Sequence, residues 1–195
     1  MGYLYSDTKW LIVKSKIFSL IEEQVAVKFT GKINILSSYN RQFLGHILFI
    51  DGSVVNVSFQ KHSDLKALYH LIIIEDLKKN FDYVIEPEVV EEKERHIHYP
   101  FSVLKKKLTD VLGLYHSSEK IRPPAQIRFL IKKNFMVSHE NVTPEEFEVL
   151  KVVSEWSDVE NIYNNCQLLD HEITLALVAL RKKGAFTLMS PAQDG

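Results

Sequence analysis

Two kinds of apolar pattern alternate along the N-terminal half of the chain. Apolar residues recur at spacings of three and four over residues 10–21 and 65–73, which predicts two amphipathic helices. Apolar and polar residues alternate over residues 32–35 and 81–86, which predicts two half-buried strands. Pro87 is expected to end the second strand, because proline cannot donate a hydrogen bond to a neighbouring strand.

The clearest local signal is a β-hairpin centred on Asp51-Gly52. The Asp-Gly pair interrupts two strand-like runs, residues 44–50 and 54–59, of which the second is rich in valine. In the first run the alternating sets are Leu44, His46, Leu48 and Ile50 and, between them, Gly45, Ile47 and Phe49. A two-residue hairpin turn of type I′ needs positive φ at both central positions, and Asp-Gly is among the pairs that adopt it most readily. The sequence therefore predicts two antiparallel neighbours joined at this turn.

The C-terminal part of the chain predicts three short helices followed by a strand. Thr143-Pro144 provides a capping residue and a proline in the first helical turn. Asp158 and Asp170 are expected to cap the second and third helices, and residues 186–188 alternate as a short strand. Three helices with a β-extension is the plan of a winged-helix domain.

A charged connector and a basic amphipathic helix join these two parts. The connector covers residues 88–100, and the helix carries Leu104, Leu108 and Leu112 on its apolar side. The predicted fold is α+β, with a small antiparallel sheet and helices. We expect three segments: an α+β domain over 1–92, a basic helical linker over 93–135 and a winged-helix-like domain over 136–195.

The charge of the chain is unevenly distributed along the sequence. The formal net charge is −1 over 195 residues. Residues 93–133 carry ten Lys/Arg against three Asp/Glu, whereas residues 134–195 carry four against ten. The overall balance argues against a dedicated nucleic-acid-binding protein, but the middle segment is basic enough to require a separate test.

The sequence offers little support for catalysis or metal binding. Cys166 is the only cysteine, so an intramolecular disulfide and a cysteine-based zinc site are both excluded. His96 and His98 would face one side of a strand, as two metal ligands do, but no third ligand follows at a fixed spacing. His46 lies within an apolar pattern and is interpreted as a core or sheet-surface histidine. No nucleophile or phosphate-binding motif is present, and we expect neither an enzyme nor a cofactor.

The compartment predicted from the sequence is the cytoplasm. The first residues lack the basic start and apolar core of a signal peptide, and no apolar run reaches the roughly 20 residues of a membrane helix. We therefore expect no membrane association.

Basic side chains raise the alternative of a DNA-binding regulator. Lys105, Lys106 and Lys107, together with Arg122 and other cations of residues 93–133, could face a phosphate backbone, and Arg181, Lys182 and Lys183 end the third C-terminal helix. The start of that helix has Asp170 and Glu172 at the base-facing end, with His171, Thr174 and Ala176 also expected to point outward. Carboxylates repel phosphate, so we expect solvation or internal pairing of the cations rather than DNA binding.

Several segments occur in an order that is known from one family. They are residues 18–21, 30–35, 45–55, 66–71 and 81–83. In this order they resemble the PATAN-like family, a domain of unknown function that occurs in bacterial signalling proteins. Residues 146–150, 159–162 and 177–186 look like the winged-helix-like extension that some members carry. The resemblance implies an α+β fold that mediates contacts with other proteins, and it implies no catalytic residues.

These observations predict a non-catalytic bacterial signalling adaptor. The partner is expected to be a protein of a signalling system or a second copy of this chain, with no nucleic acid and no membrane involved. The residues proposed for protein contact are Tyr39, Phe43, Ser53, Asn56 and Ser58, which lie in or near the hairpin; the aromatic residues among them could equally be part of the core. A DNA-binding transcriptional regulator is the alternative function.

Overall fold

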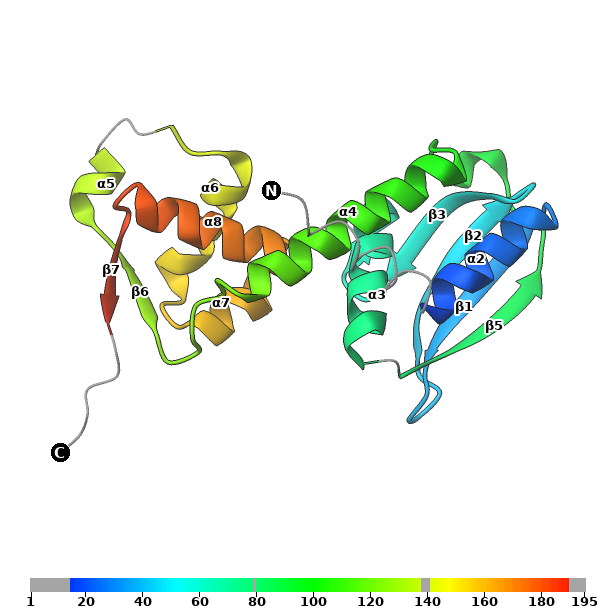
Figure 1. Cartoon of the computed structure of the whole chain (residues 1–195), viewed down its shortest axis with the longest axis horizontal. Helices are drawn as coiled ribbons and strands as arrows, with labels where there is room; N and C mark the ends of the chain where they lie inside the picture. Colours follow the sequence, from blue (N-terminus) through cyan, green and yellow to red (C-terminus); the bar gives the residue numbers. More distant parts are fainter. Residues whose placement is uncertain (1–14, 79, 138–140, 190–195) are drawn as a thin grey trace, which may run out of the picture. The chain divides into compact units, whose positions relative to one another are not determined.

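The protein folds into two compact units. The structure is a computed structural model and describes residues 15–78, 80–137 and 141–189. The N-terminal unit covers residues 1–113 and the C-terminal unit residues 114–195 (Figure 1). The division falls inside one helix, α4 (Phe101–Glu119). Each unit is described by itself.

The N-terminal unit is built on a five-stranded antiparallel sheet. Its strands are β1 (Gly31–Ser37), β2 (Phe43–Ile50), β3 (Ser53–Phe59), β4 (His62–Ser63) and β5 (Phe81–Pro87), in the spatial order β4-β3-β2-β1-β5. The predicted hairpin and the two predicted strands on either side of it are confirmed. The two-residue strand β4 has no sequence pattern of its own and was not predicted.

Helices α2 (Lys16–Ala26) and α3 (Asp64–Lys78) lie on one face of this sheet (Figure 1). The predicted first helix is confirmed from Lys16 onward and continues to Ala26, while residues 10–14 lie outside the described residues. The start of α4 packs on α2 through the rings of Phe101 and Phe18, whose centroids are 5.6 Å apart. A short 3₁₀ turn, η1 (Glu92–Glu94), lies in the connector before α4.

The helix-covered face of the sheet forms the core of the N-terminal unit. Alternate residues of the three long inner strands point to this face and are fully buried: Ile33, Ile35, Ile47, Val57 and Phe59. Each contributes about 1.5–3 kcal/mol of apolar burial, so the face determines the register. A shift by one residue would move this whole set to the opposite face.

Two glycines are required by the backbone of the hairpin. Asp51 and Gly52 adopt φ values of 47° and 74°, as the predicted type I′ turn demands. Gly45 lies at a close approach of β2 and β3, where a Cβ atom would be 2.0 Å from the carbonyl oxygen of Ser58. No side chain fits there without moving the neighbouring strand.

A buried carboxylate connects three elements of the N-terminal unit. Glu75 on α3 is 5% exposed and accepts a hydrogen bond from the backbone N–H of Ile17 at 3.0 Å. It also accepts from the hydroxyls of Ser15 and Tyr83, which belong to the N-cap of α2 and to β5. Burial and the Glu75 carboxylate both raise the pKa of Tyr83, so its phenol stays protonated and remains a donor.

The C-terminal unit combines short helices with a two-stranded sheet. Its further elements are β6 (Arg128–Ile131), α5 (Lys133–Val137), α6 (Pro144–Glu155), α7 (Val159–Asn165), α8 (Asp170–Lys182) and β7 (Phe186–Met189). Strands β6 and β7 pair antiparallel, and Arg128 also forms a bridge with Asp158 between α6 and α7. The three predicted helices and the predicted last strand are confirmed, whereas β6 was not predicted.

Two of the three predicted caps of these helices are confirmed. Thr143 and Glu146 form a reciprocal capping box at α6, and the Asp158 side chain accepts from the N–H of Asn161 at the start of α7. The prediction for Asp170 was wrong. Leu169 is the N-cap of α8, and its N–H donates to the Glu172 carboxylate at 2.8 Å. The Asp170 carboxylate instead pairs with Arg122.

The expected basic linker over residues 93–135 is not a separate segment. Its first part belongs to the N-terminal unit, where Ile97 is buried and donates its N–H to the carbonyl of Val55. Its last part supplies β6 to the C-terminal unit. Counted by unit, the charges nearly balance, with 15 Lys/Arg against 14 Asp/Glu over residues 1–113 and nine against eleven over residues 114–195.

Replacing Glu75 should destabilise the N-terminal unit. Glu75→Ala leaves two hydroxyls and a backbone N–H without their acceptor, and we expect a loss of about 3 kcal/mol. Glu22→Ala is the matched control, because Glu22 pairs with Lys105 at an exposed site and should cost less than about 1 kcal/mol. Urea unfolding followed by NMR signals of residues 31–87 measures both. Equal losses would contradict the role given to Glu75.

Candidate protein-interaction surfaces

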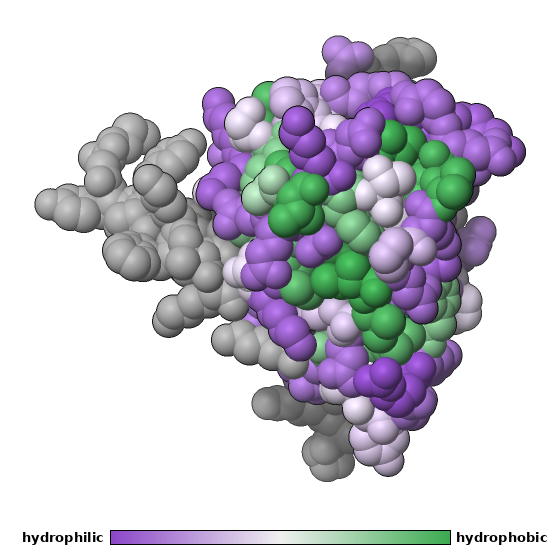
Figure 2. Space-filling view, turned by 90° about the vertical axis from the view of Figure 1, so that its right-hand side faces the viewer, coloured by the Kyte–Doolittle hydropathy of each residue, from purple (hydrophilic) through white to green (hydrophobic). Residues whose placement is uncertain are grey.

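On the face of the sheet opposite the helices, a row of residues that is polar on four of the five strands crosses the whole sheet. The strand registers place Val84, Asn34, His46, Ser58 and Ser63 side by side, one residue from each strand. We call these five residues the His46 row. Figure 2 shows one side of the N-terminal unit, on which apolar side chains lie between polar ones.

The imidazole at the centre of this row is partly desolvated. Burial lowers the pKa of His46 below its ordinary value, and the positive charge of Lys32 lowers it further. Glu88 and Glu94 act in the opposite direction. The ring of Phe43 stacks on His46 with a centroid distance of 6.3 Å. His46 is thus a sheet-surface histidine, which is one of the two locations expected from the sequence. Its lowered pKa keeps the ring neutral at pH 7.

The five predicted contact residues do not form one cluster. Phe43 is 57% exposed and lies against His46, next to Ser58 on β3. Tyr39 is 96% exposed in the turn between β1 and β2, and Ser53 is exposed beside the hairpin turn. Asn56 is half-buried and donates to the carbonyl of Glu94 at 3.3 Å. Of the five, Phe43 and Ser58 both adjoin His46, Phe43 through its ring and Ser58 across the strand pair.

The connector after β5 returns to the beginning of β3 and α3. The N–H groups of His96 and Ile97 both donate to the Val55 carbonyl at 2.9 Å, and the His96 ring bonds the Asp64 carboxylate at 2.9 Å. His96 and His98 do not lie on a strand, contrary to the geometry considered for a metal pair. Within the described ranges, no group of three or more His, Cys, Asp or Glu side chains could hold a metal ion.

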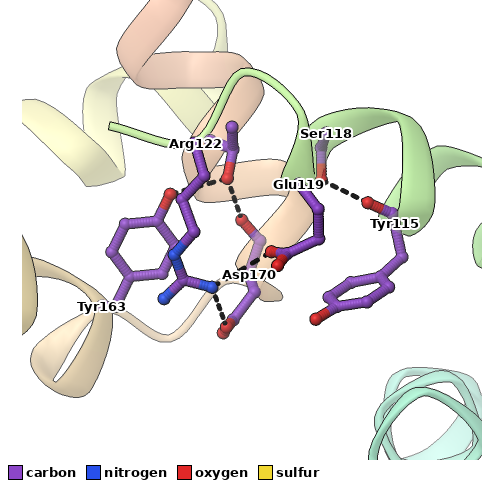
Figure 3. Close-up of polar contacts among 7 residues, drawn as sticks. Tyr115, Ser118, Glu119, Arg122, Tyr163 and Asp170 are labelled. Carbon is purple, nitrogen blue, oxygen red and sulfur yellow. Dashed lines mark hydrogen bonds and ion pairs between the residues drawn. The ribbon is translucent and has the colours of Figure 1, made fainter. Parts of the chain in front are cut away.

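A cluster of side chains around Arg122, called the arginine cluster, fixes the end of α4 within the C-terminal unit. The Arg122 guanidinium lies 3.9 Å from the ring centroid of Tyr163 and bonds Asp170 at 3.0 Å and Glu119 at 3.3 Å (Figure 3). Burial alone would lower the pKa of Arg122, but these neighbours raise it overall. The Tyr163 hydroxyl is 2.6 Å from Thr174 on α8. Arg122 is thus committed internally and is not free for phosphate.

A groove of about 250 Å³ lies beside this cluster in the C-terminal unit. Its lining residues are Lys120, Ile121, Arg122, Pro123, Pro124, Ile127, Phe129, Leu177, Val178, Arg181 and Leu188. Eight of these eleven residues are apolar, and they come from residues 121–127, β6, β7 and α8. Lys120 and Arg181 are exposed cations on its lining, and the described part of the chain contributes no carboxylate to it.

The exposed side of α8 is apolar in its middle. Leu175 is 41% exposed, and Val178 and Ala179 are half-buried on the same side at helical spacing. The prediction that His171, Thr174 and Ala176 point outward was wrong, because all three are buried. Thr174 faces the Tyr163 hydroxyl and the Asp170 carbonyl, which turns that side of the helix inward.

Three of the six residues predicted to contact nucleic acid are engaged in interactions within the protein. Lys105 pairs with Glu22 at 2.7 Å, and Lys107 lies 4.7 Å from the ring centroid of Tyr99. Lys183 pairs at 2.6 Å with Glu146, whose side chain is almost fully buried. The other three, Lys106, Arg181 and Lys182, are exposed. Lysines 105–107 belong to the N-terminal unit and residues 181–183 to the C-terminal unit.

The groove and the arginine cluster were not predicted from the sequence. Pro123-Pro124 belongs to no binding motif in the sequence, although it forms part of the groove lining. Arg122 was grouped with the basic residues, whereas it is paired with Asp170. The sequence signal that could have indicated the groove is the alternation of Ile127, Phe129 and Ile131, which predicts a strand over these residues.

No protein-family model, curated protein or solved structure matches this chain. No helix among the described residues is long and apolar enough to cross a membrane.

The titration of His46 tests the described environment of the sheet face. We expect an NMR titration midpoint below the ordinary histidine value of about 6.5. Lys32→Gln should raise the pKa of His46 because a nearby positive charge is lost, and Glu88→Gln should lower it. The folded pKa lies below the unfolded one, so the contribution of His46 to stability is present above about pH 6.5 and decreases as the pH falls below it. Shifts of the opposite sign would refute this arrangement.

Proposed function

We propose that this chain is a non-catalytic cytoplasmic adaptor of bacterial signalling. In this proposal the N-terminal unit is a PATAN-like domain and the C-terminal unit a winged-helix-like domain, and both bind partner proteins. The support for the family assignments is the sequence resemblance together with the order of strands and helices. In the C-terminal unit, β6 comes before the three helices and pairs with β7, so the sheet differs from a wing formed after the third helix.

The observation that carries the proposal is the exposed side of α8. In a DNA-binding winged helix this third helix would read bases with Arg, Asn or Gln side chains. Here Leu175, Val178 and Ala179 occupy its exposed side, between Glu172 and Lys182. Apolar groups with polar neighbours suit a protein interface. The third helix of this unit thus favours a protein partner over a nucleic acid.

The groove next to α8 defines what such a partner would present. Apolar side chains line most of it, and Lys120 and Arg181 supply positive charge. An acidic segment with apolar side chains complements both properties, because carboxylates pair with the cations while apolar groups are buried between them.

A DNA titration separates this proposal from the alternative of a transcriptional regulator. We expect no measurable change in the fluorescence anisotropy of a random labelled duplex at 50 mM salt with micromolar protein. The reason is that Lys105, Lys107 and Lys183 are paired internally, and that the start and the exposed middle of α8 lack base-reading side chains. Tight binding that falls steeply with added salt, and that Lys182→Glu weakens, would establish the regulator instead.

Charge reversal at the groove tests the adaptor itself. The tagged full chain is used to capture proteins from a cytoplasmic extract of its own organism, with quantification by mass spectrometry. The double variant Lys120→Glu, Arg181→Glu should lose at least one partner by roughly tenfold, since two cations of the groove become anions. Lys182→Glu is the matched control, because Lys182 is exposed on the same helix but does not line the groove. Identical capture by all three proteins would argue against the groove.

A further inference from the structure

The two edges of the five-stranded sheet differ in length. One edge is β4, which has two residues, and the other is β5, which has seven. A strand at the edge of a sheet presents a row of backbone groups that can pair with another chain. In the described part of the chain, β5 pairs only with β1 (Figure 1). The edge at β5 is therefore long enough to receive an added strand.

The hydrogen-bond pattern identifies which backbone groups of β5 face outward. Ser38 N–H donates to the Asn80 carbonyl at 3.1 Å, directly beyond the pairing of Ser37 with Phe81. Because bonded and non-bonded pairs alternate in an antiparallel ladder, Asp82, Val84 and Glu86 face the bonded positions of β1. Their neighbours Phe81, Tyr83 and Ile85 direct their N–H and C=O groups away from β1.

The side chains of β5 determine which strand can pair with this edge. Asp82, Val84 and Glu86 lie on the face of the His46 row, and Glu88 follows just beyond the strand. Asp82, Glu86 and Glu88 retain 37–49% side-chain exposure although each pairs with a cation of the N-terminal unit. On the helix-covered face, Ile85 is 40% exposed. A strand with basic residues on one face and apolar residues on the other complements both.

At full overlap, a second copy of β5 does not complement this edge. Antiparallel pairing of two copies about Val84 gives the full overlap of the strand, and it places Asp82 of each copy opposite Glu86 of the other. Like charges directly opposite each other destabilise a strand pair. Pro87 also ends the strand without a backbone donor. The full-overlap register of a self-pair is thus disfavoured, and the charges of the edge favour a partner of different sequence.

We propose that β5 binds an extended segment of a partner protein, in which apolar and Lys/Arg residues alternate, as a sixth strand of the sheet. Backbone bonds to Phe81, Tyr83 and Ile85 supply affinity, and the acidic groups at positions 82, 86 and 88 select the basic side of the segment. This inference deepens the adaptor function and rests on it for the partner being a protein. It concerns a different unit from the groove.

The probe for this site is a fluorescein-labelled seven-residue peptide that alternates lysine and valine, with a glutamate–valine peptide as control. Fluorescence anisotropy with the full chain should give binding of the lysine peptide that is at least about tenfold tighter than that of the glutamate peptide. Equal binding of the two peptides overturns the proposal. Sedimentation of the free protein accompanies this test, because a dimer that Ile85→Pro abolishes would mean that a second copy occupies the edge.

Proline substitution tests whether the backbone of β5 makes the contact. Ile85→Pro removes an outward N–H and should weaken the lysine peptide by about tenfold. Ile85→Ala keeps that N–H and should weaken the binding of the lysine peptide less. Val89→Pro is a matched control, since Val89 is 93% exposed and lies beyond the strand. Similar affinities for Ile85→Pro and Val89→Pro overturn the proposal.

Hydrogen exchange tests the site without any substitution. In the free wild-type chain, the amides of Phe81, Tyr83 and Ile85 should exchange rapidly, and those of Val84 and Glu86 slowly. Saturating lysine peptide should slow the exchange of the three outward amides by at least about tenfold. It should leave the exchange rates of Val84 and Glu86 unchanged. Unchanged exchange at all three outward amides overturns the strand-addition proposal. If capture by the groove still depends on Lys120 and Arg181 in that case, the adaptor function stands without it.

Discussion

The buried carboxylate of Glu75 is the constraint on which the N-terminal unit depends. It is one group, yet it accepts from the start of α2, from the cap residue Ser15 and from the phenol of Tyr83 on β5. Burying a carboxylate inside a protein costs free energy unless hydrogen-bond donors surround it. Here the donors come from α2, from its N-cap and from β5, and the local sequence of α3 does not determine where these elements lie. The same contact therefore fixes α2 against α3 and holds the edge strand β5 from its helix-covered side.

Local pattern predicted those parts of the fold whose cause is local. Asp51-Gly52 forms the hairpin because both residues adopt positive φ, and Thr143 and Asp158 cap their helices because their oxygens reach the N–H three residues on. The parts that were missed depend wholly or partly on distant residues. β6 has a local alternation of apolar residues, and it forms a sheet through pairing with β7 from the far end of the C-terminal unit. His171, Thr174 and Ala176 are buried by neighbours that no helical spacing identifies.

Charge was the least predictable property from sequence position alone. A basic middle segment beside an acidic end suggested two oppositely charged regions, but the fold divides that basic segment between both units, and their charges nearly balance. Individual cations are also committed in ways that composition does not reveal. Arg122 stacks on Tyr163 and pairs with Asp170, and Lys183 pairs with the buried Glu146. The candidate sites therefore follow from which charges stay exposed, and not from how many a segment contains.

The two candidate surfaces have opposite electrostatic preferences. The groove of the C-terminal unit has Lys120 and Arg181 on its apolar lining, whereas β5 of the N-terminal unit carries Asp82 and Glu86 along its edge. One short segment of uniform charge cannot complement both, since the charge that favours one surface disfavours the other. We propose that the groove receives side chains in a concave surface and that the edge receives an extended backbone. A chain with these two surfaces is thus suited to hold two chemically different partners, or two different segments of one partner, which is the physical requirement for an adaptor.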